Sequence, residues 1–184
     1  MPAIRTTRRE RSDAAIEQGD LVLVDLWCKV DHPRGVYSDL TRMGYMGATV
    51  PTKFADLFTI VAHAHDAAVK LVEDRFAAKQ ELRGWEVDEA CRKVIVDAGY
   101  GQAFVHRTGH SIGFTTHGDG ANMDNLETHD DRLVLAGTCF SIEPGIYLPD
   151  DGMGFRSEIN ILITRDGKPQ VKGGLQREIV PILK

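Results

Sequence analysis

The 184-residue sequence has no long run of apolar residues and only three cysteines. A helix that crosses a bilayer needs about 20 consecutive, mostly apolar residues, and no segment approaches that length. The first residues, MPAIRTTRRERSD, are basic but lack the apolar segment of a secretory signal. The cysteines, Cys28, Cys91 and Cys139, form no pairwise motif, which favours buried thiols in a reducing compartment over a disulfide framework. We therefore expect a cytoplasmic protein that makes no membrane contact.

An excess of basic charge is also missing. The 22 basic and 27 acidic residues give a net charge of −5, so a nucleic-acid-binding surface is not expected. Hydrophobic residues make up 42% of the chain and charged residues 27%, which is ordinary for a globular protein. A chain of this length can bury a sizeable core, and we expect residues 1–184 to form a single domain.

The order of patterned segments predicts an α+β fold. We expect strands at 21–27 and 36–44, a long helix from Pro51 to a break at Gly84, and a second helix that ends at Gly99. Strands at 138–143 and 154–164 follow, joined by a turn at 149–152, and a turn at 166–167 leads into a last strand. The segment 106–135, rich in His, Gly, Thr, Asn and Asp, is too polar for a core and too long for a simple connection. Such loops tend to carry function.

Four acids lie inside these apolar strands. In LVLVDLW, Asp25 interrupts a stretch that reads as a buried strand, where an unpaired carboxylate costs several kcal/mol or more. A chain reversal near His32 places Asp25 opposite Asp39, and a reversal at 150–151 places Glu143 opposite Glu158. Four clustered anions repel one another strongly, and divalent cations are the simplest way to hold them together.

A histidine cluster, HRTGHSIG followed by His117, accompanies the acids. Glycines on both sides of His110 allow the backbone to approach closely and aim the ring from a rigid turn. One imidazole and four carboxylates suit two ions such as Mn²⁺, Co²⁺, Fe²⁺ or Zn²⁺. The alternative is that each acid forms a salt bridge in a metal-free α+β domain, and a single acid in a strand would favour that interpretation.

Five segments together resemble a known family, the M24 metallopeptidases, which include methionine aminopeptidase, aminopeptidase P and Xaa-Pro dipeptidase. The matching segments are, in order, DLVLVDLW, YSDLTR, HRTGHSIG with a later His, FSIEPGIYLP and GFRSEINILI. They span roughly residues 19–184 and are most similar to the Xaa-Pro dipeptidase and aminopeptidase P branch. The resemblance implies the pita-bread fold, in which helices cover a curved antiparallel sheet.

The resemblance also implies roles for individual residues in a dinuclear exopeptidase that cleaves Xaa-Pro bonds with a metal-bridging water. Asp25 chelates one ion, Asp39 and Glu158 bridge both, and His110 and Glu143 complete the second. Mn²⁺ or Co²⁺ is the implied metal, with Zn²⁺ or Fe²⁺ as alternatives, and a peptide is the implied substrate. Glu143 also handles the proton of the attacking water as the general base.

Two further histidines receive roles from the resemblance. His117 donates a hydrogen bond to the substrate amide or to the tetrahedral intermediate, and His106 lines the substrate pocket. Arg156 is either a residue that orients the carboxylates or a surface arginine.

The sequence departs from the family pattern before Asp25 and in the hairpin after it. Only 24 residues precede Asp25, so the resemblance implies an N-terminally truncated domain without the first helical layer. A histidine that the family places upstream of the first aspartate is missing, and the segment between Asp25 and Asp39 is longer than usual. An uncovered sheet exposes apolar surface, so we expect a homo-oligomer. The alternative function is a catalytically impaired pita-bread relative that acts as a binding module.

Overall fold

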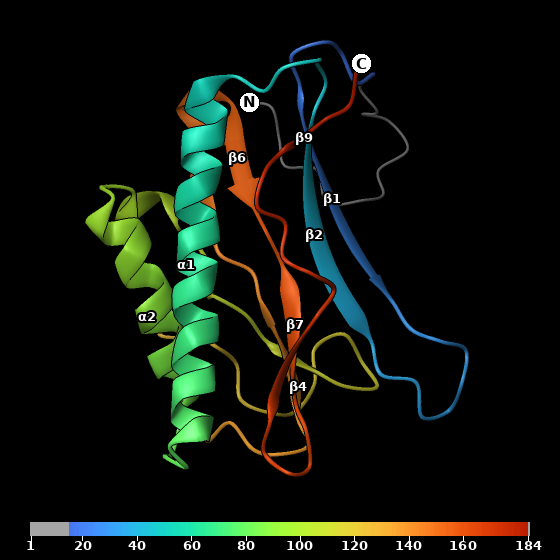
Figure 1. Cartoon of the computed structure of the whole chain (residues 1–184), viewed down its shortest axis with the longest axis vertical. Helices are drawn as coiled ribbons and strands as arrows, with labels where there is room; N and C mark the ends of the chain where they lie inside the picture. Colours follow the sequence, from blue (N-terminus) through green and yellow to red (C-terminus); the bar gives the residue numbers. More distant parts are fainter. Residues whose placement is uncertain (1–14, 184) are drawn as a thin grey trace.

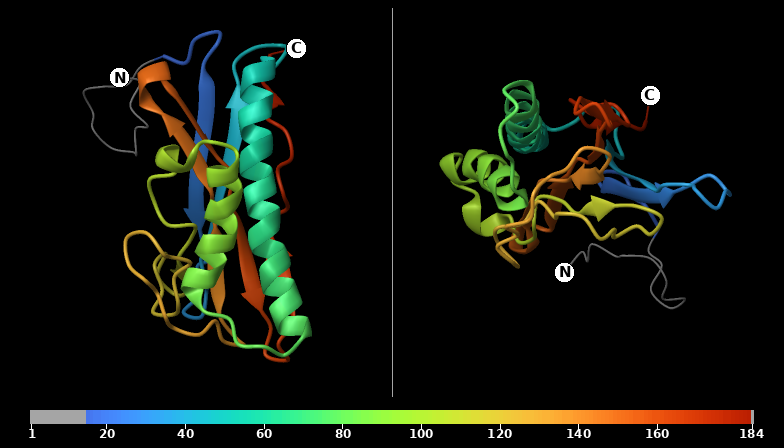
Figure 2. Two further views of the ribbon diagram at one scale, coloured as in Figure 1. Left: turned by 90° about the vertical axis from the view of Figure 1, so that its left-hand side faces the viewer. Right: turned by 90° about the horizontal axis from the view of Figure 1, so that it is seen from below.

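The structure, a computed structural model, describes residues 15–183 and confirms the α+β class. Two helices pack side by side against one face of a set of mostly antiparallel strands (Figures 1 and 2). The elements are β1 (Leu21–Cys28), β2 (Ser38–Tyr45), α1 (Thr52–Ala77), α2 (Gly84–Asp97), η1 (Gly101–Ala103), β3 (Ser111–Ile112), β4 (Cys139–Ile142), β5 (Gly145–Leu148), η2 (Pro149–Asp151), β6 (Met153–Arg156), β7 (Ile159–Ile163), β8 (Pro169–Lys172) and β9 (Val180–Pro181).

The two helices begin and end close to the predicted positions. α1 follows Pro51, whose fixed φ suits a helix start, and it ends at Ala77, before the break predicted at Gly84. Gly84 instead begins α2, and a Cβ there would lie 1.9 Å from the carbonyl oxygen of Asn122, so the position requires glycine. α2 ends at Asp97, and Gly99 follows it as the predicted C-terminal glycine, with a φ of +88° that glycine adopts without strain.

The strands form three sheets, with the orders β1–β2–β9, β3–β4–β7–β8 and β5–β6. The strand predicted at 154–164 is divided into β6 and β7, and the strand predicted at 138–143 is followed by a separate β5. Alternation along β4 and β7 sends Phe140, Ile142, Ile159 and Ile161 into one hydrophobic core with the helices. The opposite side of these strands carries the polar residues of the site.

The β1–β2 hairpin differs from the sequence prediction in two respects. Asp25 pairs with Thr41 and Asp39 pairs with Trp27, so the prediction that the two aspartates lie opposite each other is wrong. β1 is also not a buried strand, since its residues from Val24 to Cys28 are exposed. Buried thiols were predicted, and Cys91 is buried and Cys139 partly buried, but Cys28 is exposed. Within residues 15–183, no helix is both long and apolar enough to cross a membrane.

His65 on α1 generates a prediction about acid stability. It is buried, its Nε2 lies 3.1 Å from the carbonyl oxygen of Ile142, and burial lowers its pKa to about 4. The unfolded chain therefore binds a proton near pH 6.5 that the folded chain rejects, and this stabilisation is lost as pH falls from 6.5 to about 4. The loss amounts to about 3 kcal/mol. Denaturant unfolding of His65→Gln, which keeps a hydrogen-bond donor, is expected to show a flatter dependence on pH over this window.

The exposed His63 on the same helix supplies a matched control. His63→Gln is expected to keep the pH dependence of the unmodified chain. If the free energy of unfolding falls equally with pH in His65→Gln and in the unmodified chain, His65 does not contribute to the pH dependence of stability.

Candidate metal centre

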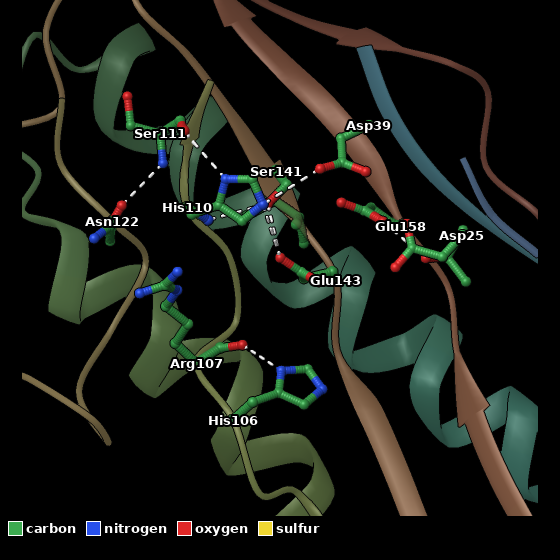
Figure 3. Close-up of polar contacts among 12 residues, drawn as sticks. Asp25, Asp39, His106, Arg107, His110, Ser111, Asn122, Ser141, Glu143 and Glu158 are labelled. Atoms are coloured by element: carbon green, nitrogen blue, oxygen red, sulfur yellow. Dashed lines mark hydrogen bonds and ion pairs between the residues drawn. The ribbon is translucent and has the colours of Figure 1, made fainter. Parts of the chain in front are cut away.

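One pocket, on the side of β4 and β7 opposite to α1, contains side chains from β1, β2, the segment 106–117 and the stretches around Glu143 and Glu158 (Figure 3). The pocket has a volume of about 360 Å³. Its lining includes every site residue predicted from the sequence, namely Asp25, Asp39, His106, His110, His117, Glu143 and Glu158. Asp39, His110 and Glu158 are the most closely grouped. All three are buried, and each offers one ligand atom within 4.8 Å of the others.

A break in the long hairpin formed by β4–β5 and β6–β7 positions the two glutamates. Ile142 pairs with Ile159 before the break and Gly145 pairs with Arg156 after it, so the register is unchanged. Glu143 therefore faces Glu158 across the break, as predicted. Pro144 has no N–H to continue the ladder, and the glutamate amides turn to other partners: Glu143 N–H donates to Thr108 O (2.7 Å) and Glu158 N–H to Thr41 O (3.4 Å).

The hydrogen bonds of His110 fix which ring nitrogen faces the carboxylates. Its Nδ1 lies 3.1 Å from the carbonyl oxygen of Ser111, which can only accept, so Nδ1 carries a hydrogen. The lone pair of a neutral ring is then on Nε2. This atom lies 3.4 Å from Asp39 Oδ2 and 3.5 Å from Glu143 Oε1. A lone pair that faces two carboxylate oxygens requires a cation between them, either a proton or a metal ion.

Gly109 allows β3 to approach β4 closely, as the sequence predicted. A Cβ at this position would lie 2.0 Å from the carbonyl oxygen of Ser141. The backbone N–H of His110 donates to Ser141 Oγ (3.0 Å), and that hydroxyl donates to Glu143 Oε1 (3.0 Å). One serine thus links the backbone of the histidine to the side chain of a glutamate.

Asn160 and Thr41 join β2 to β7, although the two strands belong to different sheets. The Asn160 amide accepts a hydrogen bond from Asp39 N (3.0 Å) and donates to Asp39 O (2.6 Å). Thr41 Oγ1 donates to Glu158 Oε2 (2.8 Å). The sequence prediction did not include these residues in the site. Strand alternation could have indicated them, because Asn160 shares a face with Glu158 and Thr41 shares a face with Asp39.

Asp25 lies at the rim of the pocket, where its side chain is 39% exposed. Its Oδ2 is paired with Arg156 Nη2, and Arg156 Nε donates to Thr41 Oγ1 (3.0 Å). The guanidinium is largely buried and contacts both the strand and the acid. Arg156 is therefore placed to orient a carboxylate and is not a surface arginine.

The electrostatics of the pocket favour a bound cation. Burial raises the pKa of Glu143 and of Glu158 above the ordinary glutamate value, and the charges of Glu143 and Asp39 raise the pKa of Glu158 further. Burial alone would lower the pKa of His110, but its hydrogen bond to Asp39 and the charge of Glu143 raise it. Among the described residues, Glu158 Oε1 is buried without a hydrogen-bond partner. An unpartnered carboxylate oxygen next to further carboxylates and an imidazole is a donor set that fits divalent metal ions.

His106 and His117 lie on two sides of this cluster. His106 Nδ1 donates to Arg107 O (2.7 Å), so its Nε2 accepts from the Tyr147 hydroxyl (2.8 Å), and burial lowers the pKa of this histidine. The exposed His117 ring meets the His110 ring edge to face, with 4.3 Å between centroids. Partial burial and the charge of His110 lower the pKa of His117, so its ring is neutral near pH 7.

Comparison with known proteins identifies the family of the chain. The profile of metallopeptidase family M24 matches residues 3–165. The chain belongs to the M24 metallopeptidase family. The Xaa-Pro dipeptidase of Pyrococcus furiosus is 35% identical to it over 156 residues, which cover 85% of this chain and 40% of that protein. The Xaa-Pro dipeptidase of Lactobacillus delbrueckii is 34% identical over 169 residues, which cover 91% and 42%.

Solved structures of other proteins share the fold of this M24 chain. Dipeptidase PepE from Mycobacterium ulcerans superposes with a TM-score of 0.77 at 32% identity, covering 93% of this chain and 42% of that one. Methionine aminopeptidase from Rickettsia prowazekii, at 21% identity, superposes with a TM-score of 0.68 and covers 87% and 66%. The chain has the pita-bread fold of these proteins and spans about two fifths of the length of the curated relatives it matches.

The two glycines that flank His110 generate a prediction about metal affinity. Gly109→Ala forces the backbone of Ser141 away and separates His110 from Glu143, with an expected destabilisation of about 1–3 kcal/mol. Calorimetric titration with Mn²⁺ is expected to show at least a tenfold loss of affinity. Gly113→Ala is the matched control, because its nearest contact would be an ordinary 3.7 Å to Gly118 Cα. Equal affinities for the two variants would contradict the role of the close approach.

Proposed function

We propose that this M24 chain is a dinuclear metal-dependent exopeptidase that removes the N-terminal residue of peptides, with Xaa-Pro bonds as its substrates. The observation that carries the proposal is the buried cluster in which His110 Nε2 faces two carboxylates and Glu158 Oε1 has no partner among the described residues. The names of the relatives supply the substrate class, since several are Xaa-Pro dipeptidases. We also retain the prediction that residues 1–184 act as one catalytic domain.

All five ligands that the family resemblance implies line this pocket. Asp25, Asp39, His110, Glu143 and Glu158 would hold the ions. Mn²⁺ or Co²⁺ suits this oxygen-rich set with one imidazole, and Zn²⁺ or Fe²⁺ are alternatives. Two such ions supply Lewis-acid activation of a water molecule and of the substrate carbonyl.

The remaining polar groups handle protons and position the substrate. Glu143 is the general base, since its carboxylate lines the pocket among the groups that would hold the metal-bound water. His117 is neutral near pH 7 and donates a hydrogen bond to the substrate amide or the tetrahedral intermediate. His106 lines the substrate pocket, and its hydrogen bonds to Arg107 O and the Tyr147 hydroxyl hold its ring in place.

One observation favours the alternative function, a catalytically impaired relative that acts as a binding module. Asp25 is already paired with Arg156, and part of its side chain is exposed to solvent. If this pair persists when metal is added, the chain binds one ion rather than two and lacks a full catalytic centre.

The decisive experiment combines metal analysis with peptide hydrolysis. The chain, loaded with Mn²⁺ or Co²⁺, is expected to retain about two ions by mass spectrometry. It is expected to cleave Leu-Pro and a longer Xaa-Pro peptide, and a chelator should abolish both reactions. One bound ion without hydrolysis of either peptide would favour the binding module.

Two variants in the same assay separate ligands from groups that contact the substrate. Glu143→Ala is expected to lose bound metal and activity while far-ultraviolet circular dichroism shows intact helices, because Glu143 is not part of the core. His117→Ala is expected to keep the metal and to lower kcat by about 10²-fold, the usual effect of removing such a hydrogen-bond donor. An unchanged metal count in Glu143→Ala would remove that residue from the site, and loss of metal in His117→Ala would make His117 a ligand.

We also propose that the chain associates with a second copy through the outer face of β1 and β2. This face exposes Val24 (51%) and Leu26 (60%) beside a pocket of about 480 Å³ with a largely apolar lining. Within the described part of the chain, β1 pairs only with β2, so its other edge is open. Sedimentation velocity is expected to show a dimer that Leu26→Glu converts to monomer. Val96→Glu, at an exposed position on α2, is the control, and a monomer at all concentrations would contradict the proposal.

A further inference from the structure

Trp27 lies at the metal centre without being part of it. It pairs with Asp39 across the β1–β2 hairpin, and because it lies two residues beyond Asp25 it shares the face of that acid. The indole lines the same pocket as the carboxylates. Among the residues that the structure places around this pocket, Trp27 carries the one large apolar side chain, since the others are charged or polar. The pocket thus has a single apolar wall.

The indole has an aromatic neighbour on one side, although 54% of the residue is exposed. Its ring meets the Tyr37 ring edge to face, with 5.4 Å between centroids and 68° between planes. Lys29 Nζ lies 4.8 Å from the centroid of Tyr37 and donates to Phe114 O (2.9 Å). The backbone N–H of Tyr37 donates to Gly113 O (3.0 Å), which ties the hairpin to the loop that leads to His117.

An exposed indole in an otherwise polar pocket is a binding surface for apolar groups. Covering the ring removes apolar area from water, and the contact with Tyr37 reduces the ordering cost of binding. The segment 29–37 supplies both Tyr37 and Lys29.

We propose that Trp27 binds a large apolar side chain of the substrate next to the scissile bond and so determines the specificity of the site. The inference rests on the proposed peptidase function, and it narrows the substrate class to peptides with a bulky apolar residue at this position. Trp27 contacts the substrate through its ring and takes no part in proton transfer or metal binding.

Fluorescence tests the contact without turnover. The sequence has two tryptophans, and Trp85 stacks on His129 (5.0 Å between centroids) outside the lining of the pocket. Its indole N–H is buried without a partner among the described residues, so Trp85→Phe removes no hydrogen bond and leaves Trp27 as the sole emitter. The probes are analogues of Phe-Pro, Gly-Phe and Gly-Pro in which a CH₂–N bond replaces the amide. At least one of the two Phe analogues is expected to shift the Trp27 emission to shorter wavelength, and the Gly-Pro analogue is not.

Kinetics test whether the contact selects substrates. Two series of dipeptides are compared. In the Xaa-Pro series the first residue is Gly, Leu or Phe, and in the Leu-Yaa series the second residue is Gly, Pro or Phe. Trp27→Ala is expected to raise KM about tenfold for the bulky members of at least one series, with kcat and metal content unchanged and little effect on the glycyl members. Trp27→Phe should retain most of the preference. The series that loses its preference identifies which substrate residue contacts the indole.

Two results would overturn the proposal. One is an emission spectrum of Trp27 that neither Phe analogue changes, and the other is a Trp27→Ala variant with unaltered preference in both series. If no peptide is hydrolysed by any variant, the peptidase function fails, and the fluorescence result still decides whether Trp27 binds an apolar group.

Discussion

The repulsion among buried carboxylates around one imidazole is the constraint on which the site depends. Asp39, Glu143 and Glu158 line one pocket, and the pKa of both glutamates is raised, chiefly by burial and then by the neighbouring carboxylates. A protein that needed these residues only for stability would be more stable with apolar side chains of similar size. Their presence in one pocket fits a site that a cation would stabilise, in agreement with the membership of the chain in a metallopeptidase family.

Polar side chains, rather than a continuous backbone ladder, hold the two halves of this centre together. β2 and β7 belong to different sheets, and they are joined near the site by Asn160, Thr41 and Glu158. Arg42 adds a second connection, since its guanidinium donates to the carbonyl oxygens of Glu158 and Gly174. The relative position of Asp39 and Glu158 thus depends on a few directional hydrogen bonds. Removing one would shift a proposed ligand without unfolding the core.

The sequence predicted the strand face on which each acid lies better than it predicted the residue opposite that acid on the neighbouring strand. Glu143 and Glu158 were paired correctly because a short turn, closed by Gly152 at φ +69°, fixes the register of their hairpin. The connection at 29–37 is longer, and no short turn in it marks the centre of the hairpin. The residue midway between paired positions is Pro33 rather than His32, so the partner of Asp25 is Thr41, two residues from the predicted Asp39. Because side chains alternate with a period of two, this error kept Asp25 and Asp39 on the correct face.

The sequence could not predict which side chains around the site contact one another. Periodicity could not indicate that Arg156 pairs with Asp25 or that Asn160 holds the backbone of Asp39, since these partners lie more than 100 residues apart. The same limit applies to Trp27, which reads as one more apolar residue of a strand. In the structure Trp27 and Asp25 project from the same face of β1, so one strand supplies both a proposed metal ligand and the apolar wall of the pocket. A shift of β1 would therefore move the substrate wall and the metal centre together, which couples the selection of substrate to the integrity of the site.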